Sequence, residues 1–296
     1  MSWDFYFEQA GARVAHTTEL RAAGATERML TSAVRLRNLI RVRRGWYCLP
    51  GTDRATVEAV RVGGRLGCVS ALGDLGIFGF DQSRTHLHLR TEASRLRSPS
   101  NRRESLDDWN RRGVTLHWSP LIHPDAANAF RVGVKDALVQ SLQCQHPWHA
   151  LASIDNALFL GMIQEEDVAE IFVAGPPKRR VLRPLVDGRS ESGQETVLRM
   201  IVHQAGLAYE IQPVIQGVGR IDMLIEGVLA VEADSRAHHD GWDAHVRDRT
   251  RDAKLGSLGY PSLRPVYQSI MFEQDFVLAA IMGVLRSSAH HRTVIG

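Results

Sequence analysis

The chain has 296 residues, 44% hydrophobic and 23% charged, with a formal net charge of +3, which is ordinary globular composition with room for two or three small domains. Its three cysteines, Cys48, Cys68 and Cys144, lie far apart without a CxxC pair, which argues against a disulfide framework and a zinc site and favours a reducing cytoplasm. The first residues lack the features of a signal peptide and no apolar run is long enough to span a bilayer, so we expect a cytoplasmic protein without a membrane partner.

Residues 1–51 are expected to form helices followed by a hairpin. His16–Ala23 and Glu27–Leu36 are helical segments, and Thr26 is placed to cap the second. Leu39–Arg44 and Trp46–Leu49 are short strands around a glycine turn. Three helices followed by a hairpin is the layout of a winged helix-turn-helix domain.

Arginines crowd the end of the last of these helices and the hairpin. Arginine greatly outnumbers lysine in the chain, and its planar guanidinium suits phosphate, although a genome rich in G and C also raises arginine content. Winged-helix proteins contact DNA phosphates at this place, and a solvated basic face is the alternative. The density favours DNA contact by Arg35, Arg37, Arg41, Arg43 and Arg44.

Residues 52–186 are expected to be a mixed α/β connecting domain. Leu87 and Leu89 alternate with polar residues as in a strand, and the arginine-rich stretch Arg95–Arg112 is typical of a loop. Three further segments have a helical pattern: Lys135–Cys144, Ala150–Gly161 and Glu165–Ala174. No chemistry in this region stands above background.

Residues 187–296 give the order helix, strand, strand, strand, helix, strand, followed by a last helix. The segments are Ser192–Gly206, Tyr209–Ile215, Arg220–Ile225, Val228–Asp234, Asp243–Leu258, Ser262–Tyr267 and Glu273–Leu285.

Acidic residues interrupt the two apolar strands of the predicted hairpin. Glu232 and Asp234 share a face because side chains alternate along a strand. A three-residue loop with Gly227 in the left-handed region pairs Leu224 with Val228 and brings Asp222 to that face, whereas a two-residue loop puts it opposite Val231.

Buried carboxylates need compensation, and Mg²⁺ or Mn²⁺ is the usual one, because hard cations take several oxygen ligands. Such an ion activates water and neutralises phosphate charge, and His238 or His239 is placed to shuttle a proton. The alternative is a solvent-facing strand end with ordinary surface acids. The clustering favours a metal-dependent site that cleaves phosphodiesters.

Two neighbouring groups each have two interpretations. Glu195 is a further candidate metal ligand, but Ser192–Glu195 also has the pattern of a capping box, which we favour. Arg247, Arg251 and Lys254 share a helical face, where they either hold DNA phosphates or pair with nearby aspartates in solvent.

These residues resemble a known family. Asp222, then Glu232-Ala233-Asp234 and a histidine, resemble the PD-(D/E)XK nuclease fold, and more closely a bacterial family of unknown function allied to very-short-patch repair (Vsr) endonucleases. RSESGQETVLRM, VRDRTRD and LGYPSLR fit the family's opening helix, later helix and last strand. LRNLIRVRRGWYCLPG at Leu36–Gly51 is similar to the winged-helix domain of AbiEi-type antitoxins.

The resemblance implies an α/β (α+β) protein with a winged helix-turn-helix domain at 1–51, a mixed domain at 52–186 and a PD-(D/E)XK restriction-endonuclease-like domain at 187–296. It implies catalytic roles for Asp222, Glu232, Asp234 and His238 or His239, and a Mg²⁺ or Mn²⁺ site at Asp222, Glu232 and Ala233. DNA is the implied partner, with no small-molecule cofactor, and repair, restriction or phage defence the implied setting.

The alternative function is a non-catalytic, antitoxin-like or regulatory DNA-binding protein with a decayed nuclease fold. The absence of the signature lysine, at whose position Asp234 stands, supports it.

Overall fold

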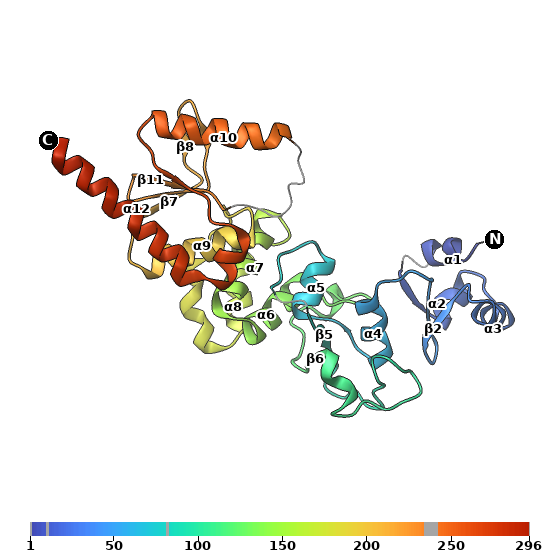
Figure 1. Ribbon diagram of the computed structural model, residues 1–296. Helices are drawn as coiled ribbons and strands as arrows, with labels where there is room; N and C mark the ends of the chain where they lie inside the picture. The colour runs from blue at the N-terminus through green and yellow to red at the C-terminus, as the bar shows by residue number, and fades with distance from the viewer. Residues whose placement is uncertain (1, 10–11, 81–82, 234–241, 296) are drawn as a thin grey trace. The chain divides into compact units, whose positions relative to one another are not determined.

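The computed structural model describes residues 2–9, 12–80, 83–233 and 242–295, with the backbone alone at 242–245, 247–248 and 289–295. The chain divides into two compact units (Figure 1): unit 1 comprises residues 1–145 with 163–183, and unit 2 comprises residues 146–162 with 184–296. Both combine helices with small β-sheets, so the predicted mixed α/β class is confirmed. Across these described residues, no helix combines the length and hydropathy needed to cross a bilayer.

Unit 1 begins with three helices and a small sheet. The elements are α1 (Trp3–Gln9), β1 (Val14–His16), α2 (Thr17–Ala22), α3 (Glu27–Arg35), β2 (Ile40–Arg43) and β3 (Trp46–Cys48). Thr26 caps α3 as predicted, its hydroxyl accepting the Met29 N–H at 3.3 Å. Strand β1 was not predicted; it pairs with β3 and completes a sheet of order β1-β3-β2 around a core that includes Leu20, Leu30 and Leu39.

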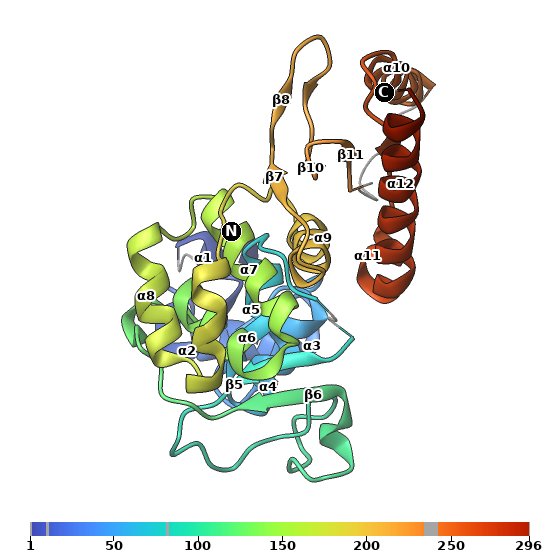
Figure 2. The ribbon, with the colours of Figure 1, turned by 90° about the vertical axis from the view of Figure 1, so that its left-hand side faces the viewer.

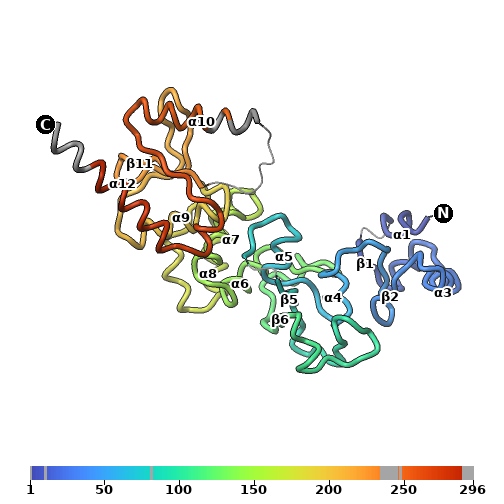
Figure 3. Tube along the Cα trace, in the orientation of Figure 1, coloured from blue at the N-terminus to red at the C-terminus, as the bar shows by residue number. Residues whose placement is uncertain are grey.

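The rest of unit 1 surrounds a second three-stranded sheet of order β4-β5-β6. Its elements are α4 (Arg54–Val62), β4 (Arg65–Leu66), α5 (Cys68–Asp74), β5 (Thr85–His88), β6 (Val114–His117), α6 (Val134–Cys144), α8 (Glu165–Ala174) and the 3₁₀ segments Asn110–Gly113, Pro124–Ala126 and Pro177–Leu185, the last of which runs into unit 2. Strands β5 and β6 run parallel and lie side by side, as the chain trace in Figure 3 shows. Helix α6 packs against α5 and α8.

Unit 2 contains a four-stranded sheet of order β12-β11-β10-β7. Its elements are α7 (Pro147–Phe159), α9 (Gly193–Gln204), β7 (Tyr209–Ile211), β8 (Val214–Ile215), β9 (Gly219–Arg220), β10 (Met223–Ile225), β11 (Leu229–Val231), α10 (Trp242–Ser257), β12 (Ser262–Leu263), α11 (Tyr267–Phe272) and α12 (Gln274–Ile295). Helix α7, from the predicted middle region, packs on α9 within this unit.

The strands of the four-stranded sheet follow the predicted order, but the predicted strands Tyr209–Ile215 and Arg220–Ile225 are each divided in two, into β7 and β8 and into β9 and β10. Strands β7, β10 and β11 are antiparallel, and β12 joins β11 in parallel after the crossover through α10. Figure 1 shows α9 and α10 on opposite sides of this sheet. Strands β8 and β9 form a separate two-stranded extension, which projects beyond the sheet in Figure 2.

The predicted register of the β10–β11 hairpin is wrong. Leu224 pairs with Ala230, not with Val228, and Ile225 pairs with Leu229. Gly227 has the predicted positive φ of 64°, but Glu226 is also left-handed at 52°. Glu226 is fixed there because its backbone N–H donates to Ala208 O at 2.8 Å and its side chain accepts the Ala208 N–H at 2.7 Å. The ladder is therefore displaced by two residues, which preserves the face of every side chain.

Candidate functional site

Asp222 and Glu232 lie at equivalent places on neighbouring chain segments of unit 2. Continuing the β10–β11 register by one residue puts Asp222 opposite Glu232, so both belong to the face that carries Leu224 and Ala230. That face packs against Leu255 of α10. This register agrees with the predicted shared face of Asp222 and Glu232, because the error in register was an even number of residues.

The environment of Asp222 disfavours its charge. The backbone N–H of Ala233 donates to Asp222 Oδ2 at 2.8 Å and stabilises the anion. Burial outweighs this bond and, together with the charge of Glu232, raises the pKa of Asp222 above its usual range. A carboxylate in this position is stabilised by any cation that approaches it.

Glu195 is directed into the same site from the first turn of α9. Its carboxylate accepts the Glu191 N–H at 3.0 Å, the Ser192 hydroxyl at 2.8 Å and the Gln212 amide at 3.0 Å. The capping interaction differs in detail from the predicted one, because Glu195 accepts the backbone N–H of Glu191. Burial and the charge of Asp222 raise the pKa of Glu195 to about 7. Glu195 is therefore a cap and also a member of the acidic cluster.

Glu232 is compensated by arginines. It is 7% exposed, and Arg251 Nη2 lies 2.7 Å from its Oε1, while Arg264 forms a second ion pair with Oε2. Arg264 also donates from Nε to Asp252 at 2.7 Å. Arg251 thus lies against the acidic cluster, whereas Lys254 on the same helix is exposed.

Several predicted site residues lie outside the described part of the chain. These are Asp234, His238 and His239, together with the side chain of Arg247. Among the described residues, Glu195, Asp222 and Glu232 do not bring three ligand atoms close enough to share one ion.

The donor set nevertheless suits a hard cation. The charge of Asp222 raises the pKa of Glu195, and the charge of Glu232 raises the pKa of Asp222. The described residues give the buried amide Oε1 of Gln194 no hydrogen-bond partner. The Nε2 of the same Gln194 donates to Ala233 O at 3.2 Å, so that carbonyl also borders the site. Carboxylate and carbonyl oxygens are the ligands of Mg²⁺ and Mn²⁺.

Four of the arginines predicted to bind DNA line two basic cavities of unit 1, and Arg35 lines neither. A cavity of about 410 Å³ is lined by Arg43, Arg44, Arg65, Arg90 and His88, among others. A second, of about 540 Å³, is lined by Arg37, Arg41, Arg61 and Arg102 among its residues.

Two of the arginines that line the first cavity, Arg43 and Arg65, are half-buried and are repelled by a neighbouring arginine. Burial first, and then the charge of Arg90, lowers the pKa of Arg65, and burial with Arg97 does the same for Arg43. Arg35, Arg37, Arg41 and Arg44 are exposed, while Arg43 is half-buried against Gly63. An anion in these cavities would relieve the repulsion among the guanidinium groups.

The sequence interpretation missed two sets of functional candidates. It favoured a purely capping role for Glu195, and it found neither a zinc site nor other chemistry in residues 52–186. In the structure Cys68, His86, His117 and Cys144 come together in unit 1. The alternation of histidine and leucine in THLHLR at Thr85–Arg90 was a usable signal, because it predicts two imidazoles on one face of a strand.

No protein-family model matches the chain. Two proteins of Mycobacterium tuberculosis are similar to it, uncharacterized protein MT2308 of strain CDC 1551 / Oshkosh and uncharacterized protein Rv2248 of strain H37Rv. Each is 29% identical over 284 residues, covering 86% of this chain and 96% of the relative.

Proposed function

We propose that the protein is a divalent-metal-dependent DNA endonuclease that hydrolyses phosphodiester bonds. The observation that carries the proposal is the effect of neighbouring acids on one another's protonation: the charge of Asp222 raises the pKa of Glu195, and the charge of Glu232 raises the pKa of Asp222. Acids whose protonation is perturbed by burial and by each other are typical of catalytic sites.

The topology of unit 2 supports the same proposal. The order α9, β7, β10, β11, α10, β12, with three antiparallel strands and a parallel fourth, agrees with the arrangement expected from the PD-(D/E)XK resemblance. The acids lie at the start of α9, before β10 and after β11. We therefore assign unit 2 to a Vsr-like nuclease domain as part of the proposal.

Asp222, Glu232 and the carbonyl of Ala233 are the groups that would hold Mg²⁺ or Mn²⁺. When bound, the ion would lower the pKa of water and neutralise charge on the phosphate. Glu195 is suited to accept a proton from the attacking water, because a carboxylate with a pKa of about 7 exchanges protons near neutrality. Arg251 and Arg264 fix the carboxylate of Glu232.

DNA binding is assigned to unit 1. The order α1, β1, α2, α3, β2, β3 supports this assignment, because it agrees with the layout expected of a winged helix-turn-helix domain with β2–β3 as its wing. The two basic cavities lie beside this hairpin, and their positive charge suits DNA phosphates. The module would hold DNA without itself carrying out chemistry.

One observation favours the alternative of a non-catalytic DNA-binding protein. The carboxylate of Glu232 is already neutralised by two arginines, which a decayed site would retain as a structural ion pair. The two functions differ in their response to metal. In the nuclease, Mn²⁺ binds to the wild-type protein but not to Asp222→Asn, whereas in the alternative neither binds Mn²⁺ and both bind DNA.

A nicking assay tests the proposal directly. We expect the full chain with Mg²⁺ or Mn²⁺ to nick supercoiled plasmid DNA, and Asp222→Asn, Glu232→Gln and Glu195→Gln each to reduce the rate by about a hundredfold or more. Glu210→Gln, an exposed carboxylate on β7, is the matched control and should retain the wild-type rate. Absence of nicking on duplex, mismatched and single-stranded DNA with both metals would contradict the assignment, as would full activity of the three variants.

A further inference from the structure

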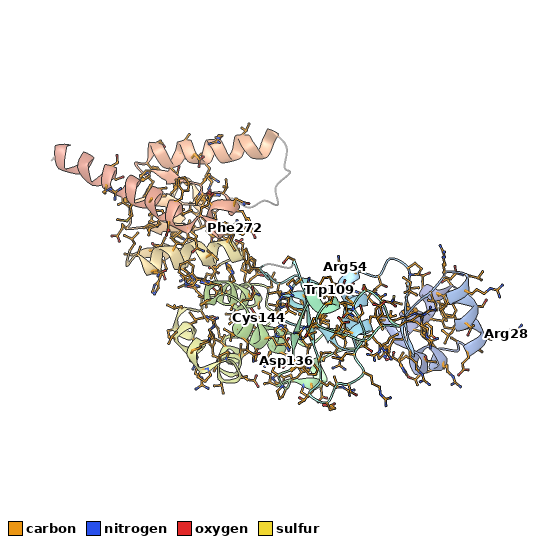
Figure 4. All side chains as sticks on the ribbon, turned by 60° about the horizontal axis from the view of Figure 1, so that its bottom comes forward. Arg28, Arg54, Trp109, Asp136, Cys144 and Phe272 are labelled. Carbon is orange, nitrogen blue, oxygen red and sulfur yellow. The ribbon has the colours of Figure 1, made fainter. Side chains whose placement is uncertain are left out.

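Four potential metal ligands meet in unit 1, far along the chain from the acidic cluster. They are Cys68 at the start of α5, His86 on β5, His117 at the end of β6 and Cys144 at the end of α6. Their ligand atoms all lie within 4.8 Å of one another. Cys144, labelled in Figure 4, is the exposed member, and the other three are buried.

The distances agree with the edges of a tetrahedral zinc site. Zinc bonds of about 2.0–2.1 Å to nitrogen and 2.3 Å to sulfur give ligand separations of about 3.3 Å between two nitrogens and about 3.5 Å between nitrogen and sulfur. His86 Nδ1 and His117 Nε2 are 3.2 Å apart, and Cys144 Sγ lies 3.8 Å from His86 Nδ1. The side chains therefore surround a space of the right size for one ion.

The fold supports these positions through the backbone. Since β5 and β6 are parallel, with His88 beside His117, the side chains of His86, His88 and His117 belong to one face of the sheet. The Ser70 hydroxyl accepts the His86 N–H at 2.9 Å, and the His117 carbonyl accepts the Leu89 N–H at 2.8 Å. Both histidines are thus attached to rigid elements.

Gln140 holds Cys68 in place and separates His88 from the cluster. Its Oε1 accepts the Cys68 N–H at 2.9 Å, and its Nε2 lies 3.1 Å from His88 Nδ1. Cys68 has a positive φ of 47°, an unfavourable conformation for a residue with a side chain. Such strain persists at sites where another interaction offsets its energy. A metal ion bound by Cys68, the two histidines and Cys144 would supply that interaction.

We propose that Cys68, His86, His117 and Cys144 bind one zinc ion that stabilises the middle of unit 1. Two thiolates and two imidazoles form a set that selects Zn²⁺ over Mg²⁺ or Mn²⁺. Four protein ligands leave no position for water, so the site is structural rather than catalytic. It joins four elements, α5, β5, β6 and α6, whose ligands lie up to 76 residues apart in the sequence, from position 68 to position 144.

Zinc content of the full chain tests this proposal. We expect about one zinc ion per wild-type chain by inductively coupled plasma mass spectrometry after purification without chelators. Cys144→Ser, a conservative change at the exposed ligand, should reduce the content at least about tenfold. Cys48→Ser, which changes the buried cysteine outside the cluster, and Glu232→Gln, which changes the acidic site, should both retain zinc.

A second measurement does not depend on how well a variant folds. Replacing the metal of the wild-type chain with Co²⁺ should give the visible absorption bands of tetrahedral cobalt with thiolate-to-cobalt charge transfer. A wild-type chain without zinc and without these bands would overturn the proposal, as would equal zinc in wild type and Cys144→Ser. A Cys68–Cys144 disulfide, detected as the loss of two hydrogens in the intact mass, would also overturn it.

Discussion

Replacing Glu195 with glutamine should change how the stability of unit 2 depends on pH. The pKa of Glu195 rises from 4.5 to about 7 on folding because of burial and the charge of Asp222. A group whose folded pKa is raised binds more protons in the native state, so stability is highest below pH 4.5 and falls as pH rises toward 7. At about 1.4 kcal/mol per pH unit the full loss is about 3 kcal/mol.

Glu195→Gln removes this titration. The free energy of unfolding of the variant, relative to wild type, should therefore increase by about 3 kcal/mol between pH 4 and pH 8. Asp222→Asn removes a neighbouring charge and so reduces the free-energy cost of ionising Glu195. The effect of Glu195→Gln should therefore be smaller in a chain that already carries Asp222→Asn. Urea unfolding monitored by hydrogen-exchange mass spectrometry of α9 peptides reports on unit 2 alone. Parallel pH profiles for wild type and Glu195→Gln would refute the reasoning.

Binding of a divalent metal ion should restore the stability that unit 2 loses when Glu195 ionises. Saturation with Mg²⁺ at about 100 times the dissociation constant should stabilise the wild-type protein at pH 8 by about 2.7 kcal/mol, and less at pH 5, where protons compete. Stabilisation at pH 8 that is equal in wild type and Asp222→Asn would show that the ion binds elsewhere.

Four further substitutions give expected outcomes. In the wild-type chain the buried Arg199 guanidinium lies 2.7 Å from the Asp155 carboxylate, and Asp155→Ala leaves it without this partner. The substitution should lower the free energy of urea unfolding by about 3–5 kcal/mol, and a loss below about 1 kcal/mol would contradict a buried ion pair. Gly227→Ala should cost about 1 kcal/mol through its positive φ alone, whereas Gly283→Ala within α12 should stabilise slightly, and equal effects would refute the turn argument. Arg65→Ala should reduce the salt slope of DNA binding by about one, and an unchanged slope would exclude a phosphate contact there.

The sequence predicted those parts of the fold that local patterns determine. The cap of α3 at Thr26 and the helix–strand order of unit 2 required only side-chain periodicity and capping chemistry. Strand β1 was not predicted because three residues are too few to show an alternation of apolar and polar side chains, and its partner, β3, lies about 30 residues later. The hairpin register was missed because the turn is fixed by hydrogen bonds between Glu226 and Ala208, and Ala208 lies outside the hairpin sequence.

The same distinction between local patterns and tertiary contacts applies to the candidate sites. A shared face for Asp222 and Glu232 was predictable because side chains alternate along a strand, a rule that holds when the register is wrong by an even number of residues. The role of Glu195 depends on the charge of Asp222, which only the folded sheet brings near. Cys68 and Cys144 are joined by tertiary packing of α5 on α6, so their spacing in the chain contained no signal.

The proposed zinc site and the proposed DNA surface share strand β5, which makes a joint prediction. His86 is a zinc ligand, and His88, two residues later on the same face, lines the cavity with Arg65 and Arg90. Loss of zinc in Cys144→Ser should therefore make strand β5, which lines this cavity, less rigid. DNA binding measured by fluorescence anisotropy should weaken about tenfold or more. Mn²⁺ binding at the oxygen ligands of unit 2 should be unchanged, because hard and soft donors select different ions. Wild-type DNA affinity in a zinc-free Cys144→Ser protein would separate the two sites and refute their coupling.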